Sequence, residues 1–107
     1  MTDLAKHSLL LETALDDETA RAARAFLRRL EGRYPVVEGI VFGSRARRSN
    51  SAGSDADLAA VLKGAHGDRT AAALDMAGVA FDVMLDTGIL VEALPLWDDA
   101  RLLLELK

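Results

Sequence analysis

Two acidic residues separated by one position, Asp55 and Asp57, lie where a polar segment meets an apolar run. Side chains alternate along a strand, so both carboxylates would point to one face with their Cα atoms roughly 6.5 Å apart. Two carboxylates at the mouth of an apolar strand repel each other unless a counter-charge is present. Mg²⁺ can supply it, because Mg²⁺ binds one or two carboxylates together with phosphate oxygens. The spacing therefore indicates a divalent-metal site for phosphate chemistry.

A glycine and a serine, Gly43 and Ser44, end the preceding apolar run at residues 36–42. Glycine lets a ligand approach the backbone closely. Serine offers a hydroxyl and an N–H at a place where a helical turn could start, and such a start favours anions. A metal on one side and a phosphate on the other is the arrangement that phosphoryl or nucleotidyl transfer requires.

The N-terminal half predicts the elements that would position these residues. The apolar runs 36–42 and 58–62 are short, bounded by turn formers and typical of buried strands. A helix is predicted over 18–31, with Asp16 or Asp17 as its N-cap and Gly32 at its end. A shorter helix over 4–14 has a poorer apolar period.

The C-terminal half predicts a loop over 63–69, a short helix over 70–76 that ends at Gly78, and a strand over 79–85. Asp82 would lie inside that strand and complete a set of three carboxylates. Residues 89–96 contain Pro95 and suit an edge strand. A last apolar helix reaches Leu106. This order of elements favours one α/β domain over residues 1–107, of the α+β type, with helices packed on a small mixed sheet.

Taken together, Gly43-Ser44, Asp55-x-Asp57 and the later Asp82 make the chain resemble the minimal nucleotidyltransferase family, relatives of the DNA polymerase beta palm. The resemblance covers residues 36–86. It implies that Asp55, Asp57 and Asp82 are catalytic and hold two Mg²⁺ ions.

The same resemblance implies that Gly43, Ser44 and Arg47 bind the ATP triphosphate. One departure from the family pattern is Arg48, which stands where the family commonly has glycine and puts the tightness of the loop in question.

Small members of this family commonly act with a separately encoded helical partner of the HEPN type. Several are antitoxins that adenylylate the partner toxin, so the resemblance implies transfer of AMP from ATP to a hydroxyl of such a protein. A second hypothesis is a non-catalytic antitoxin or scaffold that binds its partner by shape. A weaker one is nucleotidyl transfer to a small molecule such as an aminoglycoside, or to RNA ends, although no basic, aromatic-laced surface supports nucleic acid.

Composition agrees with a cytoplasmic globular domain. The 107 residues are half apolar and contain no cysteine, which excludes disulfides and thiol nucleophiles. No secretory signal or membrane-spanning run is expected. The net charge is −4, yet residues 21–48 carry eight Arg against two Glu, which could face a polyphosphate or an acidic partner. The apolar C-terminal helix leaves a homo-oligomer open.

Overall fold

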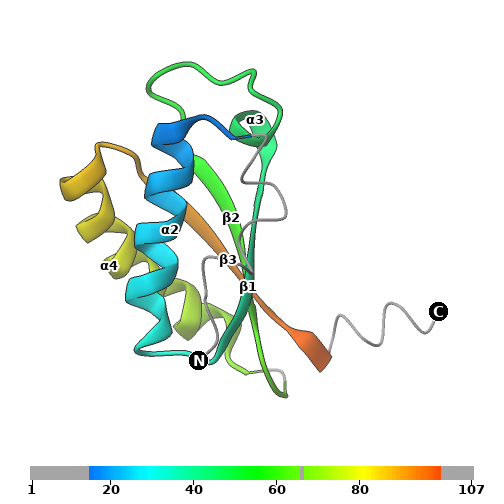
Figure 1. Ribbon diagram of the computed structural model, residues 1–107. Helices are drawn as coiled ribbons and strands as arrows, with labels where there is room; N and C mark the ends of the chain where they lie inside the picture. Colours follow the sequence, from blue (N-terminus) through cyan, green and yellow to red (C-terminus); the bar gives the residue numbers. More distant parts are fainter. Residues whose placement is uncertain (1–14, 66, 100–107) are drawn as a thin grey trace.

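The computed structural model describes residues 15–65 and 67–99, which form three strands and three helices in alternation (Figure 1). The elements are α2 (Asp17–Glu31), β1 (Val36–Phe42), α3 (Gly43–Ala46), β2 (Ala56–Leu62), α4 (Arg69–Thr87) and β3 (Val91–Trp97). The helices predicted over 4–14 and up to Leu106 lie outside these residues. None of the described helices is apolar over enough of its length to cross a membrane.

The strands form one mixed sheet in the order β1-β2-β3, which confirms the predicted fold class. β1 and β2 are antiparallel, and β2 and β3 are parallel, with α4 in the connection between them. The register places three residues in one row across the sheet. Phe42 of β1 pairs with Asp57 of β2, which in turn pairs with Glu92 of β3. β3 is an edge strand of the described sheet, as its proline predicted.

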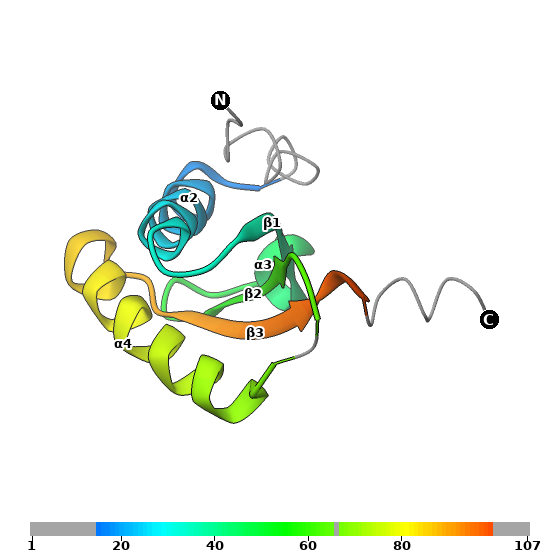
Figure 2. The same ribbon diagram turned by 90° about the horizontal axis from the view of Figure 1, so that it is seen from below.

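The two faces of the sheet have different surroundings. Helices α2 and α4 lie on the same face (Figures 1 and 2), where Leu58, Ala60 and Leu62 of β2 join the main core. Because side chains alternate along a strand, Asp57 and its neighbours on the other face point away from both helices. We call this second side the open face. On this face Ala59 and Val61 of β2 are buried, whereas Phe42, Glu92 and Leu94 around Asp57 are exposed.

Helix α2 forms as predicted. Asp16 is its N-cap, and its carboxylate accepts a hydrogen bond of 2.7 Å from the Thr19 backbone N–H. That hydrogen bond is the main cause that lowers the pKa of Asp16. The helix buries one apolar stripe, which includes Phe26 and Leu30, against the sheet and α4. Its arginines lie largely on the opposite side.

Helix α4 corrects the prediction of a short helix over 70–76 followed by a strand over 79–85. It runs without interruption for 19 residues. The apolar residues after Gly78 continue the helical spacing of those before it, so one face of a single helix enters the core. The buried residues of that face are Ala72, Met76, Val79, Ala80 and Val83.

Replacing Gly78 with alanine is expected to stabilise the protein by about 1 kcal/mol, because glycine is that much less favourable than alanine inside a helix. A Cβ at Gly78 would have no atom within 4 Å. The matched control is Gly88→Ala. Gly88 ends α4 with φ at 81°, where a side chain costs about 1–2 kcal/mol. Urea unfolding should therefore move in opposite directions for the two variants, and a less stable Gly78→Ala protein would contradict the continuous helix.

Candidate active site

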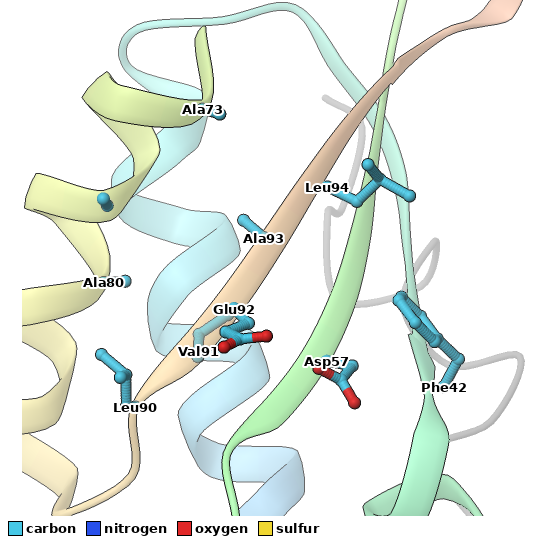
Figure 3. A pocket seen from close by; sticks show the side chains of 10 residues that line it. Phe42, Asp57, Ala73, Ala80, Leu90, Val91, Glu92, Ala93 and Leu94 are labelled. Atoms are coloured by element: carbon cyan, nitrogen blue, oxygen red, sulfur yellow. The ribbon is translucent and has the colours of Figure 1, made fainter. Parts of the chain in front are cut away.

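Carboxylates from two neighbouring parallel strands meet on the open face. Asp57 near the start of β2 and Glu92 near the start of β3 are register partners, and their side chains point toward one another (Figure 3). Asp55 lies one residue before β2 and is exposed. The sequence therefore predicted the Asp55–Asp57 pair correctly as neighbours at the mouth of a strand, and the sheet adds Glu92.

The three carboxylates share uncompensated negative charge. The charge of Asp55, followed by that of Asp57, raises the pKa of Glu92 above its ordinary value, and burial makes a smaller contribution. Like charges disfavour the ionised form of a carboxylate in this way. A group of acids that repel one another at an accessible position is typical of a site completed by a cation.

Asp82 does not join this group. It lies on α4, its side chain is exposed, and α4 covers the face of the sheet opposite to Asp57 and Glu92. The prediction that Asp82 joins the pair from a neighbouring strand is wrong, and the carboxylate that the sheet places beside Asp57 is Glu92. A signal for Glu92 was present in the sequence, because it is the one charged residue in the apolar segment 88–97.

Gly43 is the first residue of α3, immediately after β1, and lies directly against Asp57. Its φ of 76° is in the left-handed region, and a Cβ built on it would lie 2.3 Å from Oδ2 of Asp57. Only glycine fits this position without moving the carboxylate. Ser44 follows it in the first turn of α3, where backbone N–H groups have no partner within the helix. The predicted juxtaposition of the Gly-Ser pair and the acids is thus present.

Arg45 holds the loop between α3 and β2. Its side chain is only 3% exposed. It donates hydrogen bonds to the carbonyl oxygens of Ser54 (2.9 Å) and Ala52 (3.2 Å), and to the hydroxyl of Thr19 on α2 (2.8 Å). These hydrogen bonds fix the loop that leads to Asp55 against α2.

Arg47 and Arg48 are both exposed but differ in backbone conformation. Arg47 has φ −84°, whereas Arg48 has φ 60°, which glycine adopts more easily. Glycine adopts this conformation without strain, which explains why the family pattern commonly has glycine where this chain has Arg48. In this chain the loop keeps the same conformation with an arginine under backbone strain. The proposed contact of Arg47 with phosphate remains a prediction.

Glycine at position 48 is expected to be more stable than alanine there by about 1–2 kcal/mol, since alanine would keep the left-handed strain. The comparison of Arg48→Gly with Arg48→Ala cancels the loss of the arginine charge. At position 47 the order should reverse, with Arg47→Ala more stable than Arg47→Gly. Thermal unfolding of the four variants tests this, and the same order at both positions would contradict the strain at Arg48.

The residues present fit a hard divalent cation. Carboxylate oxygens are the ligands that Mg²⁺ prefers, and a cation would relieve the repulsion among Asp55, Asp57 and Glu92. Across residues 15–65 and 67–99, no three such side chains already surround one point closely enough to hold a metal ion by themselves. An open set agrees with Mg²⁺, which usually takes one or two carboxylates and completes its shell with substrate phosphates and water.

A groove of about 500 Å³ leads away from the carboxylates on the β3 side. Asp57 and Phe42 lie at one end of it, and residues 90–94 form its floor (Figure 3). Its far wall consists of three alanines of α4, namely Ala73, Ala77 and Ala80. The only charged residues that line it are Asp57 and Glu92, so the groove is apolar with an acidic end.

Residues 23–96 match the family model described as a nucleotidyltransferase domain. Neither a curated protein nor a solved structure matches the chain significantly. The matched segment is more than half of the 107 residues and contains Gly43, Ser44 and all three interacting carboxylates.

Proposed function

Because this chain belongs to the nucleotidyltransferase domain family, we propose that it transfers AMP from ATP to a hydroxyl of a partner protein, as an antitoxin that adenylylates a helical HEPN-type toxin. Nucleotidyl transfer as the general activity follows from the family. The observation that carries the proposal is the row of Asp57 and Glu92 beside Gly43-Ser44.

The carboxylates and the Gly-Ser pair have distinct roles in this proposal. Asp55 and Asp57 hold Mg²⁺, with Glu92 at its margin, and Gly43 and Ser44 bind the triphosphate through backbone N–H groups and the serine hydroxyl. When bound, Mg²⁺ would neutralise the phosphates and polarise the phosphoryl oxygens. The hydroxyl oxygen bonds to the α-phosphorus, the bond to the β-phosphate oxygen breaks, and pyrophosphate leaves.

Glu92 is placed to accept the proton of the attacking hydroxyl. A general base must lie within hydrogen-bond reach of the proton that it accepts. Glu92 is the register partner of Asp57 on the neighbouring strand, so its carboxylate lies beside the pair that would hold the metal. The geometry therefore supports Glu92 for the role that the sequence suggested for Asp82.

The surroundings of the carboxylates favour a protein acceptor over nucleic acid. Phosphodiester substrates are normally bound by Lys and Arg side chains. Among the residues that line the groove next to the carboxylates there is no Lys or Arg. A purely structural scaffold is also disfavoured, since it would gain nothing from three carboxylates that repel one another.

The direct test mixes the purified protein with Mg²⁺, ATP labelled at the α-phosphate, and a helical HEPN-type protein as acceptor. We expect label on a hydroxyl side chain of the partner, and none with Asp57→Asn. Partner neutralisation without label, unchanged in Asp57→Asn, would instead support the scaffold hypothesis.

A further inference from the structure

Across the part of the chain that the structure describes, Arg45 is the one charged side chain that is buried. It follows Ser44 directly in α3, so its backbone belongs to the turn that binds the triphosphate in the proposed function. Burying a charge is costly unless hydrogen bonds compensate for the lost water. The guanidinium finds three oxygen acceptors in two other segments, which are the hydroxyl of Thr19 on α2 and the carbonyls of Ala52 and Ser54.

Thr19 is a fixed anchor for this contact. It is fully buried in the first turn of α2, and its backbone N–H donates a hydrogen bond of 2.7 Å to the N-cap carboxylate of Asp16. Helix α2 packs on the sheet through its apolar stripe, so the position of the hydroxyl is set by the core of the domain. Nη1 of Arg45 donates to this hydroxyl at 2.8 Å, across 26 positions of sequence. The contact therefore ties α3 to the core.

The loop before Asp55 depends on Arg45 for its position. Residues 51–53 are small and exposed, so burial of apolar surface contributes little to holding them. The Ser54 N–H closes the loop on itself with a hydrogen bond of 3.1 Å to the Ser51 carbonyl, and the loop carbonyls accept hydrogen bonds from the guanidinium. One side chain thus fixes this loop and α3 relative to each other.

We propose that Arg45, anchored by Thr19, is a positioning residue that sets the separation between the Gly43-Ser44 turn and Asp55. The inference rests on the proposed function, in which the turn binds the triphosphate and Asp55 binds Mg²⁺. Mg²⁺ usually takes its ligands from carboxylates and substrate phosphates together. The turn and the carboxylate must therefore lie at a set separation for the nucleotide and the metal to bind together. Arg45 acts through the backbone of both segments.

This role predicts a loss of cooperativity between nucleotide and metal when the anchor is removed. The factor by which one ligand changes the affinity for another measures their coupling. Calorimetry gives this factor as the ratio of the affinities for α,β-methylene-ATP with saturating Mg²⁺ and with EDTA. Thr19→Val removes the hydroxyl and keeps the shape of the side chain, and it should lower the ratio by about tenfold or more. Thr19→Ser keeps the hydroxyl and should match wild type.

Val83→Ala is the control that separates positioning from stability. Val83 is fully buried on the core face of α4, so its truncation lowers stability by leaving a cavity. Urea unfolding compares its stability with that of Thr19→Val, and its affinity ratio should equal that of wild type. If Thr19→Val does not fold, Arg45→Lys gives the same test, because an ammonium group cannot reproduce the planar fork of donors that a guanidinium presents.

The affinity ratio decides the outcome. A ratio in Thr19→Val equal to wild type overturns the inference, whether the affinity itself is unchanged or falls equally with and without Mg²⁺. A ratio lowered as much in Thr19→Ser or in Val83→Ala also overturns it. Wild-type protein that binds the nucleotide equally well with and without Mg²⁺ contradicts the proposed function, and the inference falls with it. Coupled binding that Thr19→Val weakens, without AMP transfer to any acceptor, would contradict the proposed function alone and support the positioning role.

Discussion

Replacing Asp57 with asparagine is expected to slow AMP transfer by about 10³-fold, because a metal-binding carboxylate contributes several kcal/mol to the transition state and each 1.36 kcal/mol is tenfold in rate. Asp57 is the residue of the group that contacts both Gly43 and its register partner Glu92. The substitution keeps the shape of the side chain and removes its charge. The repulsion that raises the pKa of Glu92 should fall, so the domain should be at least as stable as wild type.

Single-turnover labelling with α-labelled ATP and urea unfolding, carried out on the same preparations, measure the two effects. Glu38→Gln is a suitable control, since Glu38 lies on β1 of the same sheet, where its register partner is Val61. Loss of activity together with a large loss of stability would show that Asp57 supports the fold and not the chemistry.

Glu92→Gln is expected to lower the rate of transfer by about 10²–10⁴-fold, which is the range for a general base. Asp82→Asn should leave the rate unchanged, because Asp82 is an exposed residue of α4 on the other side of the sheet. The two substitutions make the same chemical change at the two candidates for the third carboxylate. The two residues differ in position, because the sheet register places Glu92 beside Asp57 and Asp82 lies on α4.

The rates of both variants as a function of pH test this assignment. In wild type the rate should fall at low pH, because protonated Glu92 cannot accept the proton of the hydroxyl. Glu92→Gln should lose this pH dependence together with most of its activity, whereas Asp82→Asn should follow the wild-type profile. If Asp82→Asn is the inactive variant, the assignment of the third carboxylate to β3 is wrong.

Much of the site could be predicted because its signals are local. The alternation around Asp55 and Asp57, and the abrupt end of the apolar run at Gly43, depend on a few neighbouring residues. The same holds for the N-cap of α2 and the edge strand with Pro95, both of which the structure confirms. The general fold class followed from the order of these segments.

The third carboxylate could not be predicted in this way. Glycine usually weakens a helix, so Gly78 favoured a break there, and the apolar residues after it fit a strand as well as a helix. Burial against the sheet decided in favour of the helix. Asp57 and Glu92 are 35 positions apart, and parallel pairing at that separation is fixed by the packing of α4 rather than by any short pattern.

A crystal structure with Mn²⁺ and α,β-methylene-ATP, read by anomalous scattering from the manganese, tests the central claim most directly. The account predicts a manganese peak beside Asp55 and Asp57, on the open face and next to Glu92, with the triphosphate against Gly43 and Ser44. A manganese peak beside Asp82 on α4, or a triphosphate bound away from Gly43, would contradict it.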